Sequence, residues 1–404
     1  MSIFPCSVCN ALFTETLLSL DCGNLDGSTL YPTVRLIACT SCGHFYNGLL
    51  PDEISGLGEY YNNEYAPANL NSVVKEGDLP GSTGKFTHGR YDQLYQMLSP
   101  YIQFGNSILD VGCAVGGFLD FLKEKGFSSL YGVDMIEAYV EKARRNNYVI
   151  ELGRAECLPF GSNVFDTLII EQVLEHLVNP VVAFREAARV LKQGGVLCIG
   201  VPDAARYSDS YYYDFYWLLM REHIQHFDIY SLTRLAEVKG FELLGYRQTS
   251  HPIMGEKMVM PNLCAVFRYS AKAVIDRKYV AQHLLLQSMK DYINSETARL
   301  NAKRDKIRNI IKSGRPVYVW GIGREFMYLY ESGGLKNCNL TGIIDMNPFK
   351  QRTAMVGGIN VSSPDVLGDA DSNAVLLITS IAHESAIRKC AIEHFYQGEV
   401  VCLV

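Results

Sequence analysis

The sequence predicts an α/β protein with more than one domain, and three observations support this prediction. The chain has 404 residues, more than one hydrophobic core comfortably serves. Short apolar, β-branched runs alternate with helical stretches in two separate parts of the chain, as open and mostly parallel sheets require. Residues 1–80 are instead rich in Cys, Gly, Asn and Tyr, which indicates a small domain that needs a staple.

The first alternating part covers residues 81–270 and is predicted to be a Rossmann-like unit. Its predicted strands are 107–111, 130–133, 165–170 and 196–201. Residues 271–312 lack Gly and Pro and place apolar residues among charged ones, which predicts one or two linking helices. A smaller Rossmann-like unit is predicted over residues 313–404, with strands at 317–320, 341–344 and 374–379.

The composition excludes some kinds of partner. The chain has 37 basic and 43 acidic residues and no Lys/Arg block that could neutralise a run of phosphates, so we expect no nucleic acid partner. No apolar stretch reaches the ~18 residues of a membrane span, and the start lacks a signal peptide, so we expect a cytoplasmic protein without membrane contact. A small molecule is the expected partner, bound by a monomer or small homo-oligomer.

Two C-x-x-C pairs predict a metal site. Cys6 and Cys9 form the first pair, and Cys39 and Cys42 the second, with 29 residues between them. Four thiolates on a tetrahedron suit Zn²⁺ and leave no position for water, so the zinc is predicted to be structural and residues 1–80 to be a zinc-binding domain. Disulfides or unrelated buried thiols are the alternatives, but C-x-x-C cysteines seldom bridge well and twelve cysteines are few for so long a chain.

A Gly-rich turn follows the first predicted strand of residues 81–270. The run Ile108–Gly117 contains Asp110, Gly112, Ala114 and Gly116, and glycines there let the backbone approach a ligand whose negative group the next helix would favour. The second strand ends on Asp134, where a ribose diol would need a carboxylate acceptor. A dinucleotide-binding site would also have a Gly-rich turn and an acid at the end of the second strand. The missing G-x-G-x-x-G spacing, and an acid before the first glycine, favour an amino-acid-like cofactor.

These motifs resemble the class I S-adenosylmethionine-dependent methyltransferases. Three later segments keep that family's order: residues 154–160, 165–177 and 189–195 are similar to its adenine-flanking segment, its fourth strand and the turn before its fifth strand. The resemblance implies S-adenosylmethionine as the cofactor. It implies that the cofactor is bound by Asp110, Gly112, Ala114, Gly116, Asp134, Met135, Ala155, Glu156 and Glu171.

The order of the predicted domains is similar to that of the sugar C-methyltransferases, which methylate a nucleotide-linked 4-keto-deoxysugar. In that family the C-terminal domain helps to hold the nucleotide-sugar, and the matching residues here are Gly321, Gly323 and Arg324. The resemblance places a base at His223, beside Glu222, and a second histidine at His176. It places Tyr65 and His88 in the segment that covers the active site.

The sequence departs from that family at two positions. Met220 replaces a tyrosine that would donate to an enolate, and Arg221, expected to bind a substrate phosphate or carboxylate, replaces a histidine. Met220 therefore keeps open a rival hypothesis, in which a hydroxyl or amine is methylated. The aromatic residues 211–213, 216 and 217 could supply the missing donor or serve as packing or a lid. A non-catalytic nucleotide-sugar binding scaffold is the alternative from another class.

Overall fold

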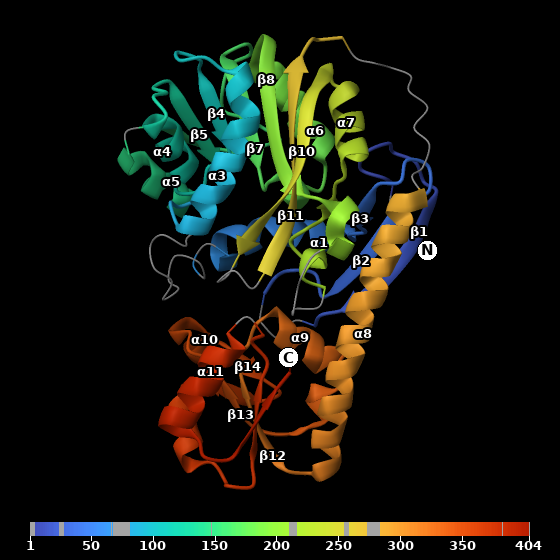
Figure 1. The fold of residues 1–404 in the computed structure, drawn as a ribbon, viewed down its shortest axis with the longest axis vertical. Coiled ribbons are helices and arrows are strands. Elements are labelled where there is room, and N and C mark those ends of the chain that lie inside the picture. The colour runs from blue at the N-terminus through green and yellow to red at the C-terminus, as the bar shows by residue number, and fades with distance from the viewer. Residues whose placement is uncertain are drawn as a thin grey trace.

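The computed structural model describes residues 5–23, 28–65, 67, 81–146, 148–209, 216–253, 258–272, 283–381 and 383–403. It contains three sheets, and Figure 1 shows the largest sheet and the C-terminal unit at opposite ends of the molecule. The N-terminal strands lie between these two units, and the helix α8 runs along one side of the molecule from the N-terminal strands to the C-terminal unit.

The N-terminal module is a four-stranded antiparallel sheet. Its order is β1 (Thr14–Asp21), β2 (Thr33–Cys39), β3 (Phe45–Asn47) and β9 (Gln225–His226). The helix α1 (Pro51–Glu59) follows β3 and leads directly into a π-helical segment, Tyr60–Tyr65. The fourth strand comes from far along the chain, so this sheet is not made by residues 1–80 alone.

The central sheet has seven strands and the topology expected of an α/β nucleotide-type fold. Its order is β10 (Phe241–Ile253), β11 (Met258–Tyr269), β8 (Leu191–Pro202), β7 (Phe165–Glu171), β4 (Ile108–Val111), β5 (Leu130–Asp134) and β6 (Val149–Leu152). The strands from β8 to β6 run parallel, whereas β10 and β11 form an antiparallel hairpin at one edge. The helices of this unit are α3 (Lys85–Leu98), α4 (Gly117–Glu124), α5 (Glu137–Ala143), α6 (Pro180–Val190) and α7 (Ile229–Glu237).

The C-terminal unit contains a six-stranded, mainly parallel sheet. Its order is β14 (Met355–Val356), β15 (Ile359–Ser362), β13 (Asn339–Ile344), β12 (Pro316–Trp320), β16 (Val375–Ile378) and β17 (Glu399–Cys402). Its helices are α9 (Arg324–Glu331), α10 (Pro348–Thr353) and α11 (Glu384–Cys390), and α8 (His283–Ser313) precedes it. Shorter 3₁₀ or π turns lie at 99–101, 144–146, 174–176, 204–209, 217–219, 335–337, 364–369 and 391–395.

All seven strands predicted from sequence are present, with bounds that differ by a few residues. The long helix α8 lies over most of the segment predicted to form linking helices. The hairpin of β10 and β11 and the edge strand β6 were not predicted. Among the described residues, no helix has the length and apolar character needed to cross a membrane.

The three units share hydrophobic cores. One cluster of buried side chains joins Val34 and Leu36 of β2 to Met289 of α8 and Val319 of β12. A second cluster joins Cys6, Cys39 and Tyr46 of the N-terminal module to Phe184 and Leu232 of the central unit. The N-terminal module is thus packed against both α/β units, and the three predicted domains share buried side chains.

Candidate functional site

The glycine-rich turn after β4 has the backbone geometry expected of a ligand-binding loop. Gly112 and Gly116 have φ values of +78° and +90°, and Ala114 also lies in the left-handed region at +45°. The carboxylate of Asp134, at the end of β5, accepts hydrogen bonds of 2.9 Å from the amides of Ala114 and Ile136. Asp134 therefore fixes the turn and still has lone pairs for a hydroxyl ligand.

Three buried carboxyl groups gather beside this turn. Burial raises the pKa of Asp110 to about 8, and Glu171 and Asp134 add to the effect. Burial also raises the pKa of Glu171, although the Arg90 guanidinium lies 3.2 Å away and opposes the shift. A cationic ligand would relieve this crowding. The residues present therefore fit a cofactor with a sulfonium and an ammonium group.

The start of α4 differs from the expectation that its amides would face a carboxylate. The amide of Gly117 donates to the carbonyl of Gly81 at 2.6 Å, so that donor is already satisfied. A Cβ at Gly117 would lie 2.3 Å from the same carbonyl oxygen, which requires glycine at this position. Arg90, on α3, is instead the cation beside the turn, and it was not predicted from the sequence.

The remaining predicted cofactor residues occupy two places. Met135 packs with Ala114 in a small apolar cluster that Tyr61 and Tyr65 cover. Ala155 is buried, whereas Glu156 lies 3.7 Å from Arg154 in a turn after β6. The π-helical segment Tyr60–Tyr65 thus packs against the glycine-rich turn through Tyr61 and Tyr65.

Two histidines from different segments meet beside this cover. The rings of His176 and His223 lie edge to face with centroids 5.2 Å apart. His176 Nδ1 lies 2.9 Å from the Glu222 carbonyl oxygen and 3.1 Å from the Tyr61 hydroxyl. Burial, followed by the neighbouring His176, holds the pKa of His223 well below its ordinary value. His223 is therefore neutral near pH 7, and its buried Nδ1 has no hydrogen-bond partner in the described part of the chain.

Glu175 lies next to the histidines and is almost fully enclosed. Its side chain is 1% exposed, its Oε1 lies 4.0 Å from His176 Nε2, and burial raises its pKa to about 8. Glu175, His176 and His223 have the composition of a metal site. However, neighbouring ligands around a divalent ion with ~2.1 Å bonds lie roughly 3.0–3.4 Å apart, closer than the observed 4.0 Å. At this spacing Glu175 and His176 form neither a hydrogen bond nor a closed metal site.

Phenolic donors are present although Met220 supplies none. The Tyr60 hydroxyl donates to Glu222 Oε1 at 2.7 Å, and Tyr61 reaches His176. Burial raises the pKa of both phenols, so both stay protonated. Of this segment only Tyr65 was predicted as a site residue, although the repeated tyrosines of 60–65 were an available signal.

The predicted substrate residues Arg221 and His88 have different surroundings. Arg221 is buried against the C-terminal unit, where its Nη2 approaches Met327 Sδ at 3.8 Å. His88 is exposed on α3, and its ring packs against Phe121. No described contact joins His88 to the two histidines. Of the aromatic run, residues 211–213 lie outside the described residues, and the buried ring of Tyr216 packs on Tyr328.

The turn at residues 321–324 of the C-terminal unit places the side chain of Arg324 near the two histidines. Gly321 has a φ of +106°, and a Cβ there would lie 2.7 Å from the Ser380 Cβ, so the glycine is required by packing. Gly323 caps α9, and the Arg324 guanidinium carbon lies 3.9 Å from the centre of the Trp217 ring. Arg324 also contributes to lowering the pKa of His223. The C-terminal unit therefore contributes charge close to the two histidines.

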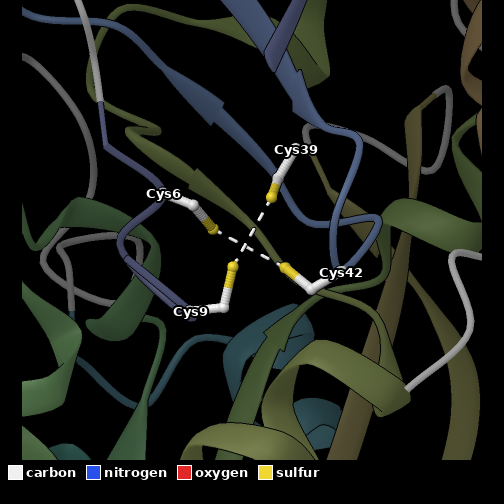
Figure 2. A group of neighbouring side chains, drawn as sticks. All are labelled: Cys6, Cys9, Cys39 and Cys42. Atoms are coloured by element: carbon white, nitrogen blue, oxygen red, sulfur yellow. Dashed lines mark hydrogen bonds between the residues drawn. The ribbon is translucent and has the colours of Figure 1, made fainter. Parts of the chain in front are cut away.

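The four predicted metal ligands converge, as Figure 2 shows. The Sγ atoms of Cys6 and Cys42 lie 3.6 Å apart, and those of Cys9 and Cys39 lie 3.5 Å apart. These distances are far longer than a disulfide bond of ~2.05 Å. They are close to the roughly 3.8 Å edge of a sulfur tetrahedron with 2.3 Å Zn–S bonds. The donor set and its spacing fit a structural Zn²⁺, and Cys22 is not part of it.

Comparison with known proteins identifies the central unit. Residues 84–245 match the family described as "Methyltransferase domain". An uncharacterised methyltransferase of Schizosaccharomyces pombe is 34% identical over 134 residues, covering 28% of this chain and 47% of that protein. A probable S-adenosylmethionine-dependent methyltransferase of Mycolicibacterium smegmatis is 28% identical over 177 residues, covering 42% of this chain and 65% of that protein. Residues 84–245 thus form a methyltransferase domain, and the relatives named as methyltransferases support S-adenosylmethionine as its methyl donor.

The likeness covers less than half of this chain and only part of the curated relatives. The chain spans about half of the Schizosaccharomyces pombe protein and 31% of a Streptomyces fradiae transposon protein that is 37% identical over 106 residues. A Methanosarcina mazei S-adenosylmethionine-dependent methyltransferase structure is 20% identical, covers 43% of this chain and 97% of that chain, and has a TM-score of 0.37.

Proposed function

We propose that the protein transfers a methyl group from S-adenosylmethionine to the carbon beside the ketone of a nucleotide-activated deoxysugar. The observation that carries this proposal is the pair of neutral histidines, His176 and His223, beside protonated phenols and the cofactor turn. A base and hydrogen-bond donors in one place are what enolate formation needs.

The roles of the residues follow from their protonation states. His223 Nδ1 accepts the proton from the carbon next to the ketone, because this nitrogen is neutral and has no described hydrogen-bond partner. Tyr61 stays protonated and donates to the oxygen on which negative charge develops, while the Tyr60 hydroxyl, which already donates to Glu222 Oε1, holds that carboxylate in place. When bound, S-adenosylmethionine supplies an electrophilic methyl group. The carbanion carbon then forms the new C–C bond while the C–S bond breaks.

Residues around the turn are proposed to hold the cofactor. Asp110 and Glu171 would face its positive groups, Arg90 its carboxylate, and Asp134 its ribose. The segment with Tyr65 would exclude water from above. Zn²⁺ at the four cysteines is proposed to be structural, because four sulfurs leave no open position.

The sugar-nucleotide part of the proposal is supported by the C-terminal unit. This unit is packed on the same segment as the histidines, and Arg324 brings a guanidinium group there that suits a diphosphate. The phenol of Tyr61 can take the place of the phenol that is missing at Met220, and this weakens the case for methylation of a hydroxyl or amine.

The proposal is tested by incubating the protein with S-adenosylmethionine and a panel of nucleotide sugars in heavy water. A product that gains one methyl group, with deuterium exchange at the adjacent carbon, is expected from 4-keto sugars. Methylation without this exchange would show that an oxygen or nitrogen is the acceptor. Absence of S-adenosylmethionine binding by calorimetry would overturn the proposal entirely.

A further inference from the structure

The segment that carries His223 is held by the N-terminal module. Strand β9, immediately after His223 and Ile224, pairs with β3, so that Phe45 faces His226 and Tyr46 faces Gln225. These pairs join residues about 180 positions apart, and they make the cysteine-containing sheet the direct neighbour of the candidate base.

Asn47, the last residue of β3, makes three hydrogen bonds at this junction. Its backbone amide donates to the Ile224 carbonyl at 2.8 Å. Its side-chain Nδ2 donates to the His223 carbonyl at 2.9 Å and to the Tyr31 hydroxyl at 3.1 Å. Tyr31 in turn donates to the Arg221 carbonyl. The backbone on both sides of His223 is therefore fixed by donors from residues 31 and 47.

The same junction is tied to both cysteine turns. Ser7, between Cys6 and Cys9, donates to Gln225 Oε1 at 2.6 Å. The ring of His44, which follows the second cysteine pair, lies 2.9 Å from the same oxygen. His44 also accepts a backbone bond of 2.8 Å from Cys39. The two turns that hold the four sulfurs thus meet at a residue two positions after His223.

These contacts are shielded from water. Tyr31 and Asn47 are each 2% exposed, and His223 is 5% exposed. Water therefore cannot readily replace a lost donor, and a carbonyl left without its partner would have to move to find another.

We propose that the cysteine module positions the base for methyl transfer, with Asn47 as the positioning residue for His223. The effect on turnover rests on the proposed function. The hydrogen bonds that Asn47 and Tyr31 make around His223, called the clamp below, can be tested without it. The module then does more than stabilise residues 1–65, because the same sheet fixes where His223 Nδ1 lies relative to the cofactor turn.

The test compares Asn47→Ser, which keeps the backbone bond and removes both side-chain bonds, with Asn339→Ser. Asn339 is an exposed strand residue whose side chain makes one bond to Gly314, so it serves as the matched control. Tyr31→Phe is a second variant that keeps the ring and removes the hydroxyl. Full-length proteins are used, and metal content is measured for each.

Three measurements are made on each variant. They are kcat, the Kd of S-adenosylmethionine by calorimetry, and the rate at which diethyl pyrocarbonate modifies His223, followed by mass spectrometry relative to exposed His394. We expect Asn47→Ser to lower kcat by about 10- to 100-fold, because displacements near 1 Å have such effects. The Kd should change less than about twofold, since the cofactor turn lies in the central unit.

His223 should become modified several-fold faster in Asn47→Ser while the metal stays bound, and Asn339→Ser should match the wild-type protein. Unchanged protection of His223 in both Asn47→Ser and Tyr31→Phe would overturn the inference. An equal fall in kcat and in cofactor affinity would also overturn it, because that pattern indicates a general loss of structure. If the unaltered protein methylates no sugar, the proposed function fails, and the labelling rates alone decide whether the clamp exists.

Discussion

At the scale of single residues, the buried ionisable groups decide what the site can do. His223 is kept neutral by burial and Asp110 is kept largely protonated, so each is in a state that water would not give it. The first state makes a base available at neutral pH. The second gives the cofactor turn fewer negative charges at pH 7 than its sequence suggests.

Replacement of His223 tests its role as the base. His223→Ala is expected to lower kcat by about two to four orders of magnitude, the usual contribution of general base catalysis, with little change in cofactor affinity. His394→Ala, an exposed histidine of the C-terminal unit, is the control and should leave kcat unchanged. Steady-state kinetics and calorimetry measure both. A loss of less than about fivefold in His223→Ala would show that another group removes the proton.

Cofactor binding should release a proton through Asp110. The free carboxyl has a pKa of about 8 and is mostly protonated at pH 7, and a bound sulfonium or ammonium favours its ionised form. The affinity for S-adenosylmethionine should therefore rise as pH increases from about 6 to 8 and level off above. Calorimetry in buffers of different ionisation enthalpy counts the protons. Asp110→Asn should abolish the release, and a pH-independent affinity in the unaltered protein would contradict the assignment.

At the scale of elements, the turn between β4 and α4 is defined by what its glycines exclude. Gly112 and Gly194 have nearly the same φ, +78° and +79°, but different surroundings. A Cβ at Gly112 would lie 2.3 Å from Val173 Cγ2, whereas a Cβ at Gly194 would meet nothing within 4 Å. The two positions therefore separate backbone strain from crowding.

This pair yields a prediction about stability. Gly194→Ala should cost about 1–2 kcal/mol, the price of a left-handed residue with a Cβ. Gly112→Ala should cost more by about 1–3 kcal/mol, because the side chain also collides with Val173. Urea unfolding followed by fluorescence measures both. If Val173→Ala fails to recover part of the loss in Gly112→Ala, crowding is not its cause.

Elements with strong local patterns were predictable, and those formed by distant pairing were not. The strands 108–111 and 130–134 were predictable because each is an apolar run that ends at a Gly or an Asp. Strand β9 is two residues long and has no periodicity, so only the folded chain shows that Gln225 joins the N-terminal sheet. Arg90 and Tyr60 were missed for a related reason, since their partners Glu171 and Glu222 lie about 80 and 160 positions away.

At the scale of the whole molecule, the N-terminal module connects the two α/β units. Its sheet shares buried side chains with α8 and β12 on one side and with the central unit on the other. The sequence indicated the cysteine turns and both α/β units. It did not indicate that they share hydrophobic cores. Composition and periodicity indicate which residues are buried, but they do not identify the residues against which these pack.

Removal of the metal should therefore affect the whole chain. Treatment with a thiol reagent and a chelator is expected to release about one Zn²⁺ per chain and to lower the Tm by several degrees, because β1–β3 lose their staple. The buried Cys198 and Cys264 should remain unmodified as an internal control. Calorimetry, metal analysis and peptide mapping follow the three effects. An unaltered Tm after complete metal loss would show that packing alone holds the module.

The pairing of β3 with β9 also sets an order of events during synthesis. All four cysteines lie within residues 6–42, so metal capture needs only the first part of the nascent chain. Its partner strand at 225–226 is translated roughly ten to forty seconds later at ~5–20 residues per second. Until then the open edge of β3 has no native partner, and it is available to other strands. Early metal capture would give this edge a fixed shape before β9 arrives.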